Sequence, residues 1–225
     1  MTPLRIFIGY DPREAVAYHV CANSIIRHAR SPVSITPLAL NTLNCVYDEQ
    51  HRDASNDFVY SRFLVPYLCN FSGSAIFIDG DMVVRDDISG LLDWLEPDHA
   101  VAVVQHDYKT KAPIKYLGAK NEDYPRKNWS SVIAWNCGHM KNRKLTPETV
   151  EDLPGSYLHR FAWMQDEEIG EVPRVWNWLV DEYEHNEDAK LLHYTLGTPC
   201  FQAYKDCDHS QEWFAELHRL TNVDG

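Results

Sequence analysis

Residues 75–93 read Ala-Ile-Phe-Ile-Asp-Gly-Asp-Met-Val-Val-Arg-Asp-Asp-Ile-Ser-Gly-Leu-Leu-Asp and indicate the fold class of this chain. The first four of these residues are apolar, too few for a helix and bounded by glycines, so they predict a buried strand. The strand ends in Asp79-Gly80-Asp81, and a second apolar triplet follows. Two carboxylates at the end of a buried strand are costly to desolvate unless a cation neutralises them. Because ligands of open α/β sheets bind at the carboxyl ends of the strands, we expect a ligand site here.

The residue types of this motif indicate a hard divalent cation. Mg²⁺ and Mn²⁺ choose carboxylate oxygens and often keep waters and substrate phosphates as their other ligands. Gly80 lets a bulky group approach the backbone. The functional interpretation is a metal ion clamped to a diphosphate, and the alternative is a surface turn with two solvated aspartates. An isolated Asp-x-Asp recurs by chance, so the context must decide between them.

Composition narrows the class of protein. The 225 residues are enough for one domain with a full core, and we expect a single domain over 1–225 with residues 200–225 as a C-terminal elaboration. The net charge of −12 argues against nucleic acid or an anionic membrane surface as the main partner. No stretch is as long as a membrane span, and the first residues read as a strand rather than a signal peptide. We therefore expect a cytoplasmic protein whose six cysteines are reduced thiols.

The order of predicted elements indicates an α/β fold. Residues 4–9 predict a strand, 14–30 an amphipathic helix and 33–40 a second strand, which together form a βαβ unit with parallel strands. Further predicted strands and helices alternate after it, and a long loop covers 106–130. The predicted strands are 75–78, 100–105, 131–140 and 190–194; the predicted helices are 58–68, 86–95, 146–153 and 211–220. We therefore expect a mostly parallel central sheet flanked by helices.

Several short motifs, in this order and spacing, resemble glycosyltransferase family 8. They are Tyr-Ser-Arg-Phe at 60–63, Phe-Ile-Asp-Gly-Asp-Met-Val-Val at 77–84, Trp-Asn-Cys-Gly at 135–138, Gln-Asp at 165–166 and a histidine at 193. The family includes glycogenin and bacterial lipooligosaccharide galactosyltransferases and has the GT-A fold. The resemblance runs from about residue 4 to about residue 200. It implies a retaining, metal-dependent transferase that moves a hexose from a UDP-sugar to an acceptor and uses Mn²⁺ or Mg²⁺.

The resemblance implies roles for individual residues. Asp79, Asp81 and His193 match the family's metal ligands, and neutral imidazole suits Mn²⁺. A lone histidine near a strand end is more often a satisfied core or surface residue. Arg62 matches an arginine that contacts the donor sugar or phosphate, a task that suits a permanently charged, bidentate guanidinium. Its alternative is an ion pair on a helix surface.

Two further residues match contacts of the donor nucleotide. Asp11 matches an aspartate that contacts the uracil, and its alternative is a helix-capping turn residue. Asn136 matches the asparagine of the family's Asn-Ala-Gly segment, although Cys137 replaces the alanine. A single asparagine at a strand end is more often a turn former.

The family pattern Asp-Gln near the anomeric carbon is Asp166-Glu167 here. Retention requires either attack on the front face within an ion pair or a covalent double displacement. A carboxylate at Glu167 could be a nucleophile or stabilise an oxocarbenium ion, as in retaining glycosidases. The alternative is a solvated acidic turn.

The lysine that normally follows the last histidine motif of the family, and steadies the diphosphate, is absent, because Thr-Pro-Cys stands at 198–200. The four lysines of the long loop are candidates to replace it: Lys109, Lys111, Lys115 and Lys120. A sugar-nucleotide pyrophosphorylase and a catalytically inactive UDP-binding homologue remain alternative functions. The acceptor, whether a saccharide, a lipid-linked sugar or another molecule, is not determined by the sequence.

Overall fold

The computed structural model describes residues 2–51 and 56–222. Residues 52–55 and the ends of the expected 1–225 domain lie outside them. The described strands form a six-stranded sheet in the order β2-β1-β3-β6-β5-β7 and a three-stranded sheet in the order β4-β9-β8. Their bounds are β1 Leu4–Gly9, β2 Val33–Leu38, β3 Ser74–Ile78, β4 Met82–Val84, β5 Val101–Val103, β6 Val132–Asn136, β7 Ile169–Glu171, β8 Trp178–Leu179 and β9 Leu191–His193.

The large sheet is parallel except for one strand. β1 pairs in parallel with β2 and β3, and β5 with β7, whereas β6 runs antiparallel between β3 and β5. The helix α1 (Ala15–His28) connects β1 to β2, which confirms the predicted βαβ unit. The mixed α/β architecture with a mostly parallel sheet is therefore confirmed.

The sheet separates two hydrophobic cores because successive strand residues point to opposite faces. Ile6, Ile8, Ile76 and Ile78 pack on the side of α1, together with Ile25 of that helix. Aromatic residues fill the other side, under the short helices: Phe7, Phe63, Phe77, Trp135 and Phe161.

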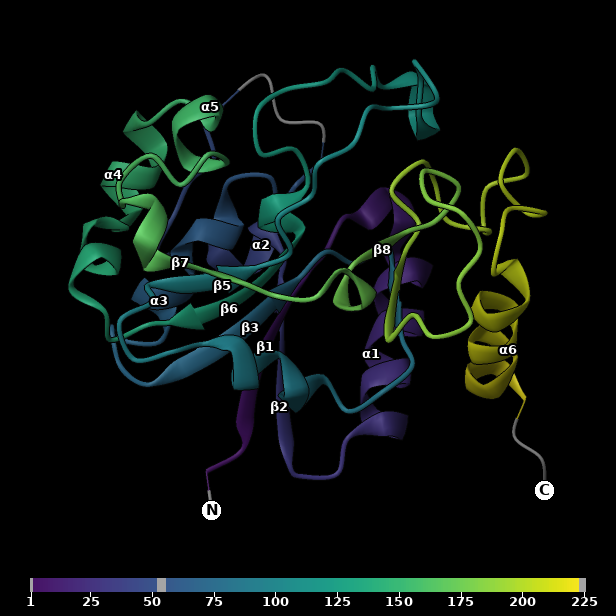
Figure 1. Cartoon of the computed structure of the whole chain (residues 1–225), viewed down its shortest axis with the longest axis horizontal. Coiled ribbons are helices and arrows are strands. Elements are labelled where there is room, and N and C mark those ends of the chain that lie inside the picture. The colour runs from purple at the N-terminus through teal and green to yellow at the C-terminus, as the bar shows by residue number, and fades with distance from the viewer. Residues whose placement is uncertain (1, 52–55, 223–225) are drawn as a thin grey trace.

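The helices lie on both sides of the sheet. Figure 1 shows α1 and α6 (Ser210–Thr221) on one side and α3 (Val65–Leu68), α4 (Pro147–Asp152) and α5 (Gly155–Leu158) on the other. The short helix α2 (Leu40–Leu43) follows β2. α6 buries Trp213 in a third cluster with Val20 of α1 and Leu192 of β9. None of the described helices has the length and apolar character needed to cross a lipid bilayer.

The continuous helix predicted over 58–68 is wrong. The chain instead forms a 3₁₀ turn at Ser61–Leu64 followed by α3. Pro66 has no amide hydrogen to donate and a fixed φ, so it is tolerated in the first turn of a helix but not further inside one. The predicted helix over 86–95 is a 3₁₀ helix at Ile88–Trp94.

Candidate active site

Asp79 and Asp81 lie at the carboxyl edge of the large sheet, directly after β3. The amide of Asp79 donates to the carbonyl of Ser131, the residue before β6, at 3.0 Å. β4 begins at Met82 and pairs antiparallel with β9, which places Met82 opposite His193. The pairing of two strands that are far apart in the sequence therefore delivers the histidine to the two aspartates.

The three side chains form a compact acceptor group. One ligand atom from each of Asp79, Asp81 and His193 lies within 4.8 Å of the others. The ring nitrogen Nδ1 of His193 lies 3.0 Å from Oδ1 of the buried Asn177, and since an amide oxygen only accepts, Nδ1 is the donor. In the neutral ring, Nε2 then carries a lone pair, and it faces Oδ1 of Asp81 at 3.3 Å. A cation between these atoms would relieve the repulsion between them.

The burial of the two aspartate carboxylates also indicates a cation site. Oδ1 of Asp79 and Oδ1 of Asp81 are both inaccessible to solvent and accept no aligned hydrogen bond, although Oδ1 of Asp79 has the Arg62 guanidinium as an ionic neighbour at 2.7 Å. A buried acceptor without a partner is costly, so such an atom indicates a missing ligand or ion. The group of two carboxylates and one imidazole fits a divalent cation such as Mn²⁺, as the resemblance implies.

Arg62 forms a buried ion pair with Asp79. Its Nη1 lies 2.7 Å from Oδ1 of Asp79 and donates to the carbonyl of Ser130 at 2.9 Å, while Nε donates to the carbonyls of Phe58 and Val59. The side chain is only 5% exposed, so this is a buried ion pair rather than a pair on a helix surface.

Burial, together with the nearby charges, shifts the pKa values of Asp79, Asp81 and the neighbouring Glu14. Burial raises the pKa of Asp79 to about 6, although Arg62 opposes the shift. Burial also acts against the ionised form of Asp81, but positive charge at His193 and Lys115 lowers the pKa of this carboxyl overall; where the His193 ring is neutral, a bound cation would supply that charge instead. Burial and the nearby Asp81 raise the pKa of Glu14 to about 8, so this carboxyl group is mainly protonated at neutral pH. The three carboxyl groups thus have distinct protonation behaviour.

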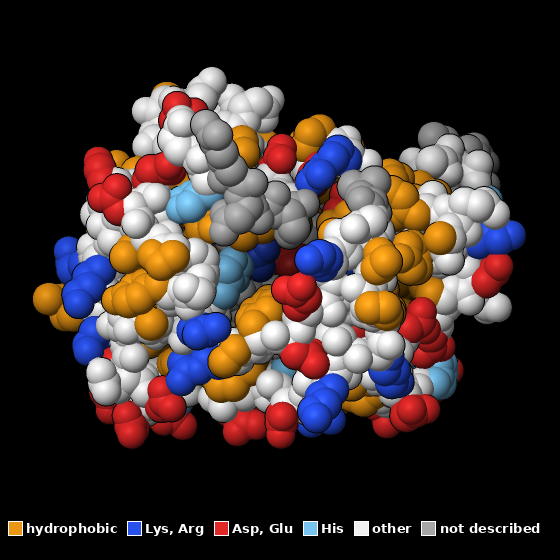
Figure 2. Space-filling view, turned by 90° about the horizontal axis from the view of Figure 1, so that it is seen from above, with side chains coloured by type: hydrophobic (Ala, Val, Ile, Leu, Met, Phe, Trp, Pro, Cys, Tyr) orange, Lys and Arg blue, Asp and Glu red, His pale blue; other side chains and the backbone are white. Residues whose placement is uncertain are grey.

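The group opens into a pocket. Figure 2 shows a hollow near the centre of the face seen from above, with histidine, basic and acidic side chains inside it. The side chains and backbone that line the pocket come from both halves of the chain: Asn56, Val59, Arg62, Asp79, Asp81, Lys115, Tyr116, Tyr124, Asn128, Ser130, Ser131, His159, His193 and Thr195.

Among the four candidate lysines of the long loop, Lys115 lines this pocket. The backbone of the next residue, Tyr116, donates to the carbonyl of Leu196 at 2.8 Å, which fastens the loop beside His193. Lys111 and Lys120 instead lie near carboxylates outside the pocket, Glu184 and Glu122, each at 3.7 Å. The structure therefore singles out one of the four candidate cations.

Ser130 and His159 are pocket residues that the sequence reasoning missed. The hydroxyl of Ser130 lies 2.7 Å from Nδ1 of His159, and burial, with the positive charge of Arg62, lowers the pKa of this histidine to about 3. His159 is therefore a neutral imidazole at physiological pH. Nothing in the local sequence distinguishes it from a core histidine, because its position depends on packing against Phe63 and Tyr60.

Asp11 and Gly80 lie at the same edge but have local partners. Oδ1 of Asp11 accepts from the amide of Arg13 at 2.9 Å and the carboxylate pairs with the Arg13 guanidinium, so the capping role expected of a turn aspartate is present. A Cβ on Gly80 would lie 2.4 Å from the carbonyl oxygen of Gly9. The absence of a side chain at Gly80 thus serves the packing of β1 against this turn.

Asn136, Asp166 and Glu167 are not brought to the pocket. Because β6 is antiparallel, its last residue, Asn136, lies opposite Ser74 at the amino edge of the sheet, about 16 Å of strand away from Asp79. Asp166 and Glu167 precede β7, which is parallel to β5, and so lie at the same amino edge. Both are exposed, and Asp166 pairs with Arg126 at 2.6 Å.

Comparison with known proteins supports the fold assignment. The structure is similar to the WbbM bifunctional glycosyltransferase (TM-score 0.70, 15% identity, 99% of this chain and 50% of that one). It is similar over nearly the full length of both chains to the galactosyltransferase LgtC in complex with donor and acceptor sugar analogues (TM-score 0.61, 14% identity, 98% and 97%). Mouse xyloside xylosyltransferase 1 matches with a TM-score of 0.55, 11% identity, and coverage of 86% and 98%. The chain thus has the GT-A fold of these glycosyltransferases and spans half the length of the bifunctional one.

Sequence comparison identifies a family. No protein-family model matches the chain. Protein CDI of Arabidopsis thaliana is 44% identical over 223 residues, which cover 96% of this chain and 86% of that protein. This level of identity over almost the whole length shows common descent. The chain belongs to the family of Arabidopsis protein CDI.

Proposed function

We propose that this protein is a metal-dependent glycosyltransferase that moves a hexose from a UDP-sugar to an acceptor with retention of configuration. The observation that carries the proposal is the buried group of Asp79, Asp81 and His193, in which Oδ1 of Asp81 and Nε2 of His193 face each other and Oδ1 of Asp79 accepts no aligned hydrogen bond. The GT-A fold places this group at the carboxyl edge of the sheet, where such folds bind ligands.

Asp79, Asp81 and His193 would hold Mn²⁺ or Mg²⁺. Such an ion supplies Lewis acidity that stabilises negative charge on a departing diphosphate. Arg62 keeps Asp79 ionised and oriented, and Asn177 fixes the ring of His193 with Nε2 toward the ligand position. Lys115 adds a positive charge at the pocket wall, where the diphosphate needs one and the family's usual lysine is absent.

The acceptor side of the proposed reaction involves Ser130 and His159. A neutral imidazole that holds a hydroxyl group at 2.7 Å can orient a sugar hydroxyl without bringing positive charge toward a cationic anomeric centre. The catalytic roles that the resemblance implies for Asp166 and Glu167 would require their exposed turn to reach the pocket. Unchanged kcat in Glu167→Gln would exclude the nucleophile role.

The test is release of UDP from UDP-glucose, UDP-galactose and UDP-N-acetylglucosamine, each with Mn²⁺ and with EDTA. We expect slow hydrolysis of one donor that requires metal and is lost in Asp81→Asn. Asp93→Asn, which changes an exposed aspartate outside the pocket, is the matched control and keeps wild-type release. Metal-dependent UDP binding without release from any donor would favour an inactive homologue. Absence of both UDP binding and UDP release would refute the proposal.

A further inference from the structure

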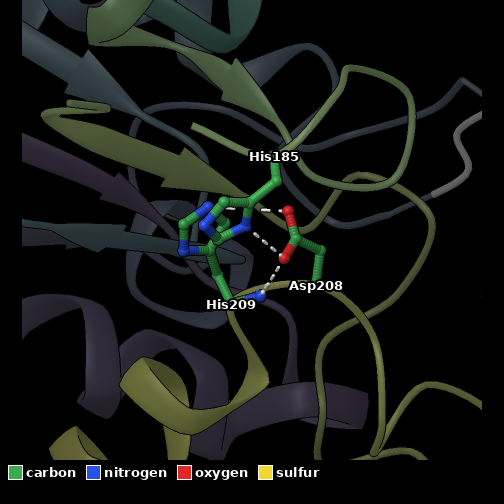
Figure 3. A group of neighbouring side chains, drawn as sticks. All are labelled: His185, Asp208 and His209. Carbon is green, nitrogen blue, oxygen red and sulfur yellow. Dashed lines mark hydrogen bonds and ion pairs between the residues drawn. The ribbon is translucent and has the colours of Figure 1, made fainter. Parts of the chain in front are cut away.

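A second group of potential metal ligands lies outside the pocket, between the loop that follows β8 and the segment that leads into α6. It consists of His185, Asp208 and His209, shown in Figure 3, and one ligand atom from each lies within 4.8 Å of the others. The two histidine rings stack at 4.4 Å with an interplanar angle of 13°. The structure thus joins His209 to a histidine from another loop.

The ring of His209 points to a ligand. Its side chain is only 1% exposed, and its Nδ1 lies 2.8 Å from Oε1 of Glu212. Since a carboxylate only accepts, Nδ1 is the donor, and the other nitrogen, Nε2, is the acceptor of the neutral ring. Nε2 is buried without a hydrogen-bond partner and lies 3.5 Å from Oδ2 of Asp208. Two acceptors therefore face each other, as in the group around Asp81.

His185 reaches the same carboxylate from the other loop. Its Nδ1 lies 2.7 Å from Oδ1 of Asp208, and its Nε2 lies 3.0 Å from Oε1 of Glu187. Each histidine of the group thus has one nitrogen toward Asp208 and the other on a separate glutamate. Carboxylates on the outer nitrogen of a histidine fix its tautomer and raise its basicity, which is the usual arrangement behind metal-bound histidines.

We propose that His185, Asp208 and His209 bind a divalent transition-metal ion, of which Zn²⁺ fits best, with a water molecule as the fourth ligand. Two imidazoles and one carboxylate suit Zn²⁺, whereas Mg²⁺ and Ca²⁺ prefer oxygen ligands throughout. The group faces an open pocket also lined by Asp206 and Glu187, so an ion and its water can reach it and the surrounding charge attracts cations. Binding would draw the two stacked rings toward one point.

An ion at this position would fasten the loop between β8 and β9 to the start of α6. The two segments already touch through Asp181, whose carboxylate accepts from the amide of Asp208 at 3.1 Å. Tyr194, directly after β9, holds the start of α6 as well, because its hydroxyl donates to the carbonyl of His209 at 2.8 Å. The metal would therefore strengthen an existing junction. At an ion concentration about 100 times the Kd, we expect Tm to rise by about 5–10 °C.

The test is calorimetric titration of Zn²⁺ into the full-length Asp81→Asn protein, because the group near Asp79 is a competing site. We expect one Zn²⁺ site per chain to be lost when His209→Ala or His185→Ala is added, whereas any ion held by the third group of potential ligands, Glu49, His51 and Glu151, stays bound. Glu187→Gln changes an exposed residue that is not a ligand and should weaken binding about 10–100-fold without affecting folding. His218→Ala, on the exposed part of α6, is the matched control.

Absence of Zn²⁺ binding by Asp81→Asn would refute the proposal and leave a hydrogen-bonded cluster with a protonated His185. Unchanged affinity in His185→Ala and Glu187→Gln would also refute it. These outcomes do not depend on the glycosyltransferase proposal, because no sugar nucleotide is present and the substitutions added to Asp81→Asn lie outside the pocket.

Discussion

Replacing Arg62 by methionine tests the central ion pair of the pocket. The change removes the partner of Asp79 and three hydrogen bonds to backbone carbonyls, all from a side chain that is 5% exposed. Removing one member of a buried pair typically costs about 3–5 kcal/mol, because the other charge stays buried without compensation. We therefore expect Arg62→Met to lower the free energy of unfolding by that amount in urea titrations at pH 7.

The same variant should weaken metal binding. Arg62 is the main influence that lowers the pKa of Asp79, which burial raises to about 6, so without it the carboxyl group is protonated near neutral pH. Each unit by which this pKa exceeds the pH weakens binding of Mn²⁺ about tenfold. Calorimetric titration of Mn²⁺ into the variant and the wild type measures the loss.

A double-mutant cycle with Asp79→Asn separates the charge pair from simple loss of packing. We expect Arg62→Met and Asp79→Asn together to be less destabilising than the sum of the single changes, with a coupling energy of about 1–3 kcal/mol. Arg160→Met, at an exposed position, controls for the substitution itself and should change stability by less than about 0.5 kcal/mol. Additive effects, or an Arg62→Met protein as stable as the wild type, would refute the reasoning.

Three further predictions test other parts of the site. Asn177→Leu removes the acceptor that orients His193, so Mn²⁺ affinity should fall about 10–100-fold in calorimetry; unchanged affinity would mean that the ring is fixed by other contacts. Gly80→Ala places a Cβ 2.4 Å from the carbonyl oxygen of Gly9 and should cost about 1–3 kcal/mol in urea unfolding, and a neutral result would contradict this close approach. His159 has a pKa of about 3 in the folded protein against 6.5 for the free side chain, so between pH 6 and 4 only the unfolded state binds the proton. The free energy of unfolding therefore falls by about 1.4 kcal/mol for each pH unit of acidification through this group. In urea titrations, the free energy of unfolding of His159→Gln should depend on pH with a slope shallower by that amount.

The sequence predicts which residues form strands and helices better than it predicts whether a strand runs parallel or antiparallel to its neighbours. Alternating and continuous apolar runs predict β1, β3 and α1 because burial on one or both faces imposes a pattern on the residues themselves. Direction in the sheet depends on how each strand is connected and paired. Asn136 shows the consequence: at the end of a parallel strand it would lie beside Asp79, but β6 is antiparallel and carries it to the other edge.

Strand direction also decides which residues line the pocket. Ser130 and Ser131 directly precede β6 and line the pocket, and the carbonyl of Ser131 accepts from the amide of Asp79, because an antiparallel strand presents its first residues to the carboxyl edge of its parallel neighbours. Their small polar side chains carry no motif of their own. Asp166 and Glu167 lie at the amino edge of the sheet, as Asn136 does, because they precede β7, which is parallel to β5.

The sequence by itself determined the α/β class and the position of Asp79 and Asp81 at a strand end, because both follow from hydrophobic pattern and from the cost of burying charge. The family resemblance names His193 and Arg62 as neighbours of these aspartates and Lys115 as a candidate, whereas Ser130 and His159 follow from the tertiary structure alone. His193, Arg62, Lys115 and His159 reach the pocket through strand pairing, loop closure and side-chain packing over long separations in the chain. Such contacts depend on the fold as a whole, so no local stretch of sequence encodes them.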